Sequence, residues 1–256
     1  MDNAMLIQYC SDLHLEFPEN REFLLKKPLV PKASILLLAG DIVPFASLSA
    51  QDGFFDHLSK SFQRTYWIPG NHEYYGSDIR RRSGSFQENI RENVILTNNT
   101  VIEEGEVRLI LSSLWTNITP RFEKEIQQSL HDFHVIHHGT RKLRAAHVNA
   151  LHVQSLDFIK GELARPTEKK TMIVTHHVPT YFHYPEVYKD SPLNEAFAVE
   201  LFPLIRDAAV SHWIYGHHHF NRNDFQIGGT TLTTNQLGYV HKNENRGFRP
   251  DKTIEI

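Results

Sequence analysis

The sequence contains a single cysteine among its 256 residues, which excludes an internal disulfide. Cys10 lies inside an apolar run, where a buried and unreactive thiol is expected. No apolar run approaches the length of about 20 residues that a membrane-spanning helix needs. The first apolar stretch is interrupted by Asp12, unlike the apolar region of a secretory signal. We therefore expect a cytoplasmic protein.

A strong charge of either sign is also missing. The chain has 27 lysines and arginines against 30 aspartates and glutamates, a formal net charge of −3. The bulk charge therefore gives no footprint for nucleic acid or an anionic membrane, so nucleic acid is a less favoured partner than a small molecule. No internal repeat, low-complexity linker or shift in composition divides the chain, and we expect one domain over residues 1–256. The sequence does not indicate an oligomeric state.

Short apolar runs alternate with helical patterns, which predicts an α/β fold. Five of these runs are expected to be strands that end just before polar side chains, at residues 6–10, 35–39, 65–68, 172–175 and 213–215. The run at 35–39 is apolar throughout, as in a parallel strand covered on both faces. Ligands of open α/β sheets collect at the carboxyl ends of the strands. We therefore expect residues far apart in the sequence to meet in one crevice.

The remaining elements are read from periodicity and turn residues. Helices are expected at residues 51–63, 83–92 and 196–209, together with a long helix that begins after an N-cap at Thr140 and stops before Pro166. Hairpins are expected around Gly105 and Gly228. Residues 116–139 carry few strand signals, so we expect a mostly helical excursion over 116–165 beside the site.

The polar residues after the five strands are of types that bind metals. Asp12 and His14 have the i, i+2 spacing that aims two side chains the same way in extended chain, and His217 and His219 repeat it. The other strand ends carry Gly40-Asp41, Gly70-Asn71-His72-Glu73 and His176. Such a mixture of nitrogen and oxygen ligands suits Mn, Fe, Zn, Co or Ni, whereas the lack of thiolates disfavours copper(I) and iron–sulfur clusters.

Each of these motifs alone is weak. An Asp-x-His sequence is more often a turn or a satisfied polar pair, and Gly-Asp after a strand is common at turns. All of them, however, follow predicted strands in a chain with 17 histidines. His176 and His177 are adjacent, so one side chain is expected to point into the cluster and the other away from it. We choose His176, because it directly follows the strand-ending Thr175.

The ordered set of motifs over residues 12–219 resembles the calcineurin-like metallophosphoesterase superfamily. The resemblance implies a four-layer α/β/β/α sandwich with the site at one edge of two packed sheets. It also implies two divalent or trivalent metal ions with Asp41 bridging them. One ion would be bound by Asp12, His14 and His219, and the other by Asn71, His176 and His217. His72 would be the catalytic histidine.

The resemblance implies hydrolysis of a phosphomonoester or phosphodiester. A hydroxide that bridges the two metals would attack the phosphorus, while His72 assists the departure of the leaving group. Glu73 would either orient His72 or form a surface salt bridge. The alternatives are a metal-binding scaffold of the same fold without catalysis, and a nuclease, which needs a basic groove. Candidate substrate contacts, each of which could instead pack in the core, are Tyr74, Tyr75, Trp115, His131, Asp132, His177 and Tyr181.

Overall fold

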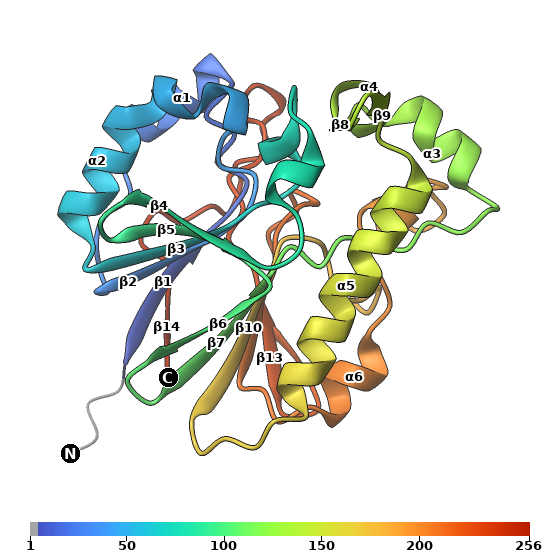
Figure 1. Ribbon diagram of the computed structural model, residues 1–256. Helices are drawn as coiled ribbons and strands as arrows, with labels where there is room; N and C mark the ends of the chain where they lie inside the picture. Colours follow the sequence, from blue (N-terminus) through green and yellow to red (C-terminus); the bar gives the residue numbers. More distant parts are fainter. Residues whose placement is uncertain (1–4) are drawn as a thin grey trace.

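Two six-stranded sheets lie face to face in the computed structural model, which describes residues 5–256 (Figure 1). Along the first sheet the order is β14 (Thr253–Glu255), β1 (Leu6–Cys10), β2 (Ile35–Ala39), β3 (Arg64–Ile68), β5 (Val94–Asn98) and β4 (Phe86–Arg91). Along the second it is β12 (Phe225–Ile227), β13 (Thr230–Thr233), β11 (His212–Ile214), β10 (Lys170–Thr175), β7 (Val107–Ser112) and β6 (Thr100–Glu104).

Helices cover the outer face of each sheet, which gives four layers (Figure 1). On the first sheet, α1 (Pro18–Lys26) and α2 (Asp52–Ser61) pack through Leu24, Phe55 and Leu58. On the second, α5 (Ala145–Leu163) and α6 (Phe202–Asp207) pack through Ile159 and Ile205. The predicted four-layer α/β/β/α sandwich is confirmed.

Strand β2 shows why its sequence is apolar throughout. Leu36 and Leu38 face α2 and the outer core, whereas Ile35, Leu37 and Ala39 face the second sheet. Successive side chains of a strand point to opposite faces, so a strand covered on both faces needs apolar residues at every position. Strands β1, β2, β3 and β5 are parallel, and so are β7, β10, β11 and β13. The carboxyl ends within each group therefore lie at one edge.

Three predicted helices differ from the structure. Residues 83–92 do not form a helix but contain strand β4. This strand pairs antiparallel with β5 at the sheet edge, and its polar side chains gave no strand signal in the sequence. The helix expected from Thr140 begins at Ala145, because β9 (Arg141–Lys142) first pairs with β8 (His137–His138). The helix expected at 196–209 is shortened to α6, because the chain near Ala198 forms a bridge with Val178.

The two hairpins around Gly105 and Gly228 are confirmed, whereas α1 and β14 were not predicted. Between residues 116 and 139 lie α3 (Glu123–Ser129) and α4 (Asp132–Val135). The 3₁₀ helices are η1 (Phe45–Gln51), η2 (His72–Tyr74), η3 (Ile79–Arg82), η4 (Glu186–Tyr188), η5 (Asn194–Ala196) and η6 (Val240–Lys242). Within residues 5–256, no helix has the length and apolar character needed to cross a membrane.

Candidate metal centre

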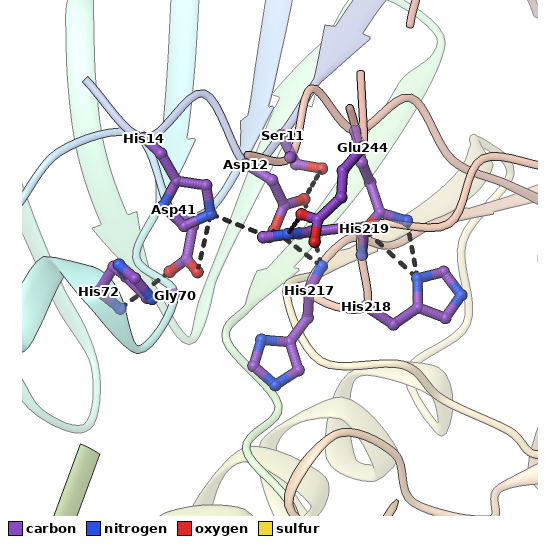
Figure 2. Close-up of polar contacts among 12 residues, drawn as sticks. Ser11, Asp12, His14, Asp41, Gly70, His72, His217, His218, His219 and Glu244 are labelled. Carbon is purple, nitrogen blue, oxygen red and sulfur yellow. Dashed lines mark hydrogen bonds and ion pairs between the residues drawn. The ribbon is translucent and has the colours of Figure 1, made fainter. Parts of the chain in front are cut away.

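The polar residues predicted to meet do so at the carboxyl ends of five strands. Asp12 and His14 follow β1, Asp41 follows β2, Asn71 and His72 follow β3, His176 follows β10, and His217 and His219 follow β11. Asp12, His14, Asp41 and His176 are almost completely buried. Figure 2 shows Asp12, His14, Asp41 and His219 lying close together, with His217 and His218 pointing in different directions.

Asp41 lies between two sets of histidines. Its Oδ2 is 3.8 Å from His14 Nε2, and its Oδ1 is 3.4 Å from His176 Nε2. On one side His14 Nε2 lies 2.9 Å from His219 Nε2, which is 3.4 Å from Asp12 Oδ1. On the other side His176 Nε2 lies 3.0 Å from His217 Nδ1. Asp12, His14 and His219 form one group that could hold a cation, and Asp41, His176 and His217 form another.

Hydrogen bonds on the outer side of the cluster fix the tautomers of these imidazoles. His176 Nδ1 lies 2.9 Å from the Ala39 carbonyl, and His217 Nε2 lies 3.3 Å from the Ala196 carbonyl. A carbonyl oxygen can only accept, so each of these nitrogens carries the proton. Uncharged His176 and His217 would consequently face each other with two lone pairs.

The second pair of histidines repeats this arrangement with carboxylates. His14 Nδ1 contacts Glu16 Oε1 at 3.1 Å, and His219 Nδ1 contacts Glu244 Oε2 at 2.5 Å. Metal-binding histidines usually donate their other N–H to a carboxylate or a backbone carbonyl in this way. The opposed lone pairs and the adjacent carboxylates of Asp12 and Asp41 therefore fit cations that prefer mixed nitrogen and oxygen ligands.

The pKa values of the four candidate histidine ligands are shifted in opposite directions, raised in two of them and lowered in the other two. Burial opposes protonation of His176, but the Asp41 carboxylate raises its pKa to about 9. Burial likewise opposes protonation of His219, but hydrogen bonds to Asp12 and Glu244 raise its pKa to about 9. Burial lowers the pKa of His14 and His217. Without a cation, each pair therefore holds one proton where two lone pairs would otherwise meet.

The backbone at these positions is not extended, so the i, i+2 argument for their orientation is wrong. Positive φ angles occur at Asp12 (56°), His14 (46°), Asp41 (55°), His217 (80°) and His219 (52°). Such left-handed conformations are uncommon for residues other than glycine and cost of order 1–3 kcal/mol each in strained cases. The surrounding strand-end loops must hold these residues in place.

Two glycines are needed because the cluster is packed against the backbone. A Cβ atom at Gly70 would lie 2.2 Å from Asp41 Oδ1 and 2.6 Å from His176 Nε2. A Cβ at Gly40 would lie 2.4 Å from His176 Nδ1, and Gly40 has a φ of +89°. The Gly-Asp and Gly-Asn motifs of the sequence thus include a steric requirement as well as a ligand.

Glu73 has neither of its two predicted roles. Its side chain is completely buried, so it forms no surface salt bridge, and its contacts do not include His72. Its carboxylate accepts hydrogen bonds from Gly70 N, Asp41 N, Ile42 N and Trp67 Nε1. Glu73 therefore ties the end of β2 to the end of β3 beneath the cluster.

His72 is held instead by Glu16, which the sequence analysis did not identify. His72 Nδ1 lies 2.7 Å from Glu16 Oε1, and its Nε2 lies 3.1 Å from the Tyr239 hydroxyl. Its ring stacks on Tyr75 with centroids 4.0 Å apart. His72 could also form a cation site with His14 and Asp41, but both of its nitrogens have protein partners. Glu16 follows Asp12 and His14 closely in the sequence, and its position as a third polar residue beside these candidate ligands is the signal that could have revealed it.

Asn71 is oriented by a residue of the helical segment. Its Nδ2 donates to both carboxylate oxygens of Asp132 in α4, at 3.0 and 3.2 Å. Its Oδ1 consequently points into the cluster, 3.2 Å from His176 Nε2. The Tyr75 hydroxyl donates to the same carboxylate at 2.6 Å. Asp132, predicted as a substrate contact, also positions a candidate ligand.

The structure brings His176, and not His177, into the cluster. His177 Nδ1 donates to the Ser113 carbonyl at 3.0 Å, and its ring packs against Trp115. Burial, reinforced by the neighbouring His176, lowers the pKa of His177 to about 3, so this side chain is neutral at physiological pH. His218 also turns away from the cluster, to Gln236.

A cavity of about 340 Å³ opens beside the cluster. Of the candidate substrate contacts, Tyr75, His131 and Asp132 line it. The other four pack elsewhere: the Tyr74 hydroxyl donates to Arg82 O, the Tyr181 hydroxyl donates to Ala198 O, and Trp115 and His177 are buried against each other. Tyr184, which belongs to the aromatic loop that begins at Tyr181, also lines the cavity, and lining residues that the sequence did not suggest include Leu130, Tyr188, Ser191, Leu193, Phe197, Tyr239 and Glu244.

Comparisons with known proteins agree with this geometry. The model of a family described as calcineurin-like phosphoesterase matches residues 5–221. An uncharacterized protein of Acanthamoeba polyphaga mimivirus is 31% identical over 278 aligned residues, covering 98% of this chain and 96% of that one. Among solved structures, the phosphopantetheinyl hydrolase from Mycobacterium tuberculosis is similar with a TM-score of 0.71 and 14% identity, covering 100% of this chain and 97% of that one. A dimetal phosphatase from Danio rerio is similar with a TM-score of 0.52 and 14% identity, covering 91% of this chain and 87% of that one.

Proposed function

The chain belongs to the calcineurin-like phosphoesterase family, and from this premise we propose that it hydrolyses a phosphomonoester or a phosphodiester with two bound metal ions. The position of Asp41 carries this proposal. Each of its carboxylate oxygens faces a histidine from a different group, 3.8 Å from His14 and 3.4 Å from His176. A single carboxylate between two sets of imidazole nitrogens suits a bridging ligand.

The proposed ligands divide into two sets around Asp41. Asp12, His14 and His219 would hold one ion, and Asn71, His176 and His217 would hold the other. When bound, the two ions supply a water of lowered pKa and positive charge for the phosphoryl oxygens. The nitrogen and oxygen donors suit Mn, Fe, Zn, Co or Ni.

His72 is the residue proposed to assist the leaving group. It lines the cavity beside Asn71, and Glu16 holds its Nδ1. The Glu16 carboxylate stabilises the protonated ring, which can then give the proton on Nε2 to the departing oxygen. A general acid of this kind typically contributes about 10²–10⁴-fold to the rate. Tyr239, 3.1 Å from Nε2, keeps the ring in place until the substrate enters.

The cavity supports an enzyme over a metal-binding scaffold, because a scaffold needs no space beside its ions. Its volume of about 340 Å³ lies within the range of about 300–1,000 Å³ for small-molecule sites. A nuclease would need basic side chains along the path of the nucleic acid backbone. The lining residues, all within the described part of the chain, include no lysine or arginine, which supports a small phosphate ester as the substrate.

The experiment is a panel of phosphomonoesters and phosphodiesters, assayed with Mn²⁺, Fe²⁺, Zn²⁺, Co²⁺ or Ni²⁺ against a chelator-treated control. We expect phosphate ester hydrolysis that depends on added metal and is lost in Asp41→Ala. A metal-loaded protein that hydrolyses none of the esters would favour the scaffold. Faster cleavage of oligonucleotides than of any small ester would favour the nuclease.

A further inference from the structure

The cavity beside the metal centre contains acidic side chains and histidines but, among its lining residues in the described chain, neither lysine nor arginine. Asp132 and Glu244 line it. Both carboxylates are already used by the protein: Asp132 accepts from Asn71, and Glu244 contacts His219. A second anionic group on the substrate would therefore find no lysine or arginine to pair with and would lie near two carboxylates, which is unfavourable at an interface.

Aromatic rings pack directly against two histidines at the cluster. Phe197 packs against His217 with ring centroids 4.7 Å apart, and Tyr75 stacks on His72 at 4.0 Å. Both rings line the cavity, so the reacting phosphoryl group at the cluster would lie next to apolar surface.

Further aromatic and aliphatic side chains from residues 184–197 line the cavity and form an apolar wall. Tyr184 and Tyr188 line the cavity with ring centroids 6.4 Å apart, and Leu130 and Leu193 add aliphatic surface. Tyr188 keeps 42% of its surface exposed although it is a large aromatic residue. An exposed ring at the wall of a concave site gains by covering its apolar surface with a ligand.

We propose that the substrate is a small phosphate ester with one anionic group, the reacting phosphate, and with an uncharged aromatic or similarly apolar leaving group. This inference rests on the proposed function and deepens it. The cluster receives the phosphate, and the aromatic wall formed by Tyr75, Tyr184, Tyr188 and Phe197 receives the organic part. The acidic residues select against a second negative charge.

Three matched probes test the inference: ethyl phosphate, 2-phenylethyl phosphate and 2-(4-carboxyphenyl)ethyl phosphate. All release a primary alkoxide, so their intrinsic reactivities are similar and differences in kcat/KM report recognition. We expect the phenyl group to raise kcat/KM by about tenfold or more, as burial of an apolar group does. The added carboxylate should lower it again by about tenfold. Equal values for ethyl and phenylethyl, or a preference for the carboxylated probe, would overturn the inference.

Variants of one loop locate the effect. Ser191→Lys places a cation in the cavity wall and should raise the kcat/KM of the carboxylated probe, relative to the uncharged phenylethyl probe, by about fivefold. Val187→Lys is the matched control, because Val187 is 78% exposed on the same loop and is not among the lining residues. Tyr188→Ala should lower the ratio of kcat/KM for 2-phenylethyl phosphate to kcat/KM for ethyl phosphate. Val187→Ala is its control. Equal responses in a variant and its control would contradict the assignment of the wall.

Binding separates this inference from the proposed function. The three corresponding phosphonates cannot be hydrolysed, and their dissociation constants for the metal-loaded protein are measured by calorimetry. A protein that turns over neither these esters nor any phosphodiester of the panel, but binds phenylethyl phosphonate about tenfold more tightly than the other two phosphonates, would refute hydrolysis and retain the selectivity. A protein that hydrolyses all three esters with equal kcat/KM and binds all three phosphonates equally would support hydrolysis and refute the selectivity.

Discussion

At the scale of single residues, the candidate ligands are defined by what lies behind them. Four histidines are candidate ligands: His14, His176, His217 and His219. The outward nitrogen of each contacts a carboxylate or a carbonyl oxygen, so the inward nitrogen can face a cation. His72 differs, because the Glu16 carboxylate and the Tyr239 hydroxyl occupy both of its nitrogens. This difference separates binding from chemistry in a way that substitutions can measure.

The first prediction compares Asp41 with His72. Asp41→Ala should lower the affinity for both metal ions and remove activity, because the Asp41 carboxylate faces both groups of histidines. His72→Ala should retain both metals and lower kcat by about 10²–10⁴-fold. Metal content and rate are measured on the same preparations. If His72→Ala also empties the site, His72 is a ligand and its proposed role is wrong.

The second prediction compares two neighbouring histidines. His176→Ala should lower occupancy of the ion proposed at Asn71 and nearly abolish turnover, because His176 Nε2 faces Asn71 Oδ1 and His217. His177→Ala should keep both metals with a milder rate loss, since its contacts are with Ser113 and Trp115. It should still cost about 1–3 kcal/mol of stability, because a buried ring is removed and the Ser113 carbonyl, which keeps the His177 N–H at 3.3 Å, loses its side-chain donor. Metal titration and urea unfolding of the two variants test this, and the reverse pattern would transfer the ligand role to His177.

Sequence patterns identified which residues would meet but not how the backbone aims them. Asp12, Asp41 and His217 follow apolar runs, and the rule that parallel strands end at one edge predicts their convergence. Their left-handed φ angles depend on hydrogen bonds between loops that are distant in sequence, such as His14 N to Asp41 O at 3.0 Å. Glu73 was misassigned for the same reason, because its donors come from two separate strand ends.

At the scale of elements, local sequence was least informative at sheet edges and in short helices. Strand β4 is polar on one face and was mistaken for a helix, because its strand character comes from pairing with β5. Strand β14 escaped prediction since its three residues join β1 from the far end of the chain. Buried parallel strands such as β2, in contrast, carry their signal at every residue.

The third prediction concerns the attachment of α5 to the second sheet. Arg108 of β7 donates to the carboxylate and the backbone carbonyl of Glu162 in α5, and both side chains are mostly buried. Arg108→Ala should cost about 3 kcal/mol of unfolding free energy, because a buried carboxylate loses its partner. Arg165 contacts the other oxygen of Glu162 but is 72% exposed, so Arg165→Ala should cost less than about 1 kcal/mol. Urea unfolding of the metal-free proteins measures both, and equal losses would contradict this account.

At the scale of the whole molecule, the centre depends on segments from most of the chain. One sheet supplies Asp12 to His72, the other supplies His176 to His219, and α4 adds Asp132, which orients Asn71. The expectation of one domain over residues 1–256 stays a prediction. A site built between two sheets cannot form before both are in place, so metal binding should report the folded state of the entire assembly.

The last prediction joins metal stoichiometry to pH. We expect two metal ions per chain at saturation, because seven candidate ligands exceed what one ion usually takes from protein. In the metal-free protein, burial opposes the protonation of His176 and His219, but the nearby carboxylates raise both pKa values to about 9. Each of these histidines is therefore protonated at pH 7, and loading two ions should release about two protons. The apparent affinity should rise from pH 7 towards pH 9 and level off above it.

Calorimetry with Mn²⁺ in buffers of different ionisation enthalpy counts the released protons, and elemental analysis counts the ions. The sign of the pH effect follows from competition, since protons and cations occupy the same inward nitrogens of His176 and His219. Acidification below pH 7 should weaken binding further, by about tenfold per pH unit for each proton displaced. Saturation at one ion, without loss when Asn71 or His176 is replaced, would contradict the two-metal centre. An affinity that does not change between pH 6 and pH 9 would contradict the assignment of these nitrogens as ligands.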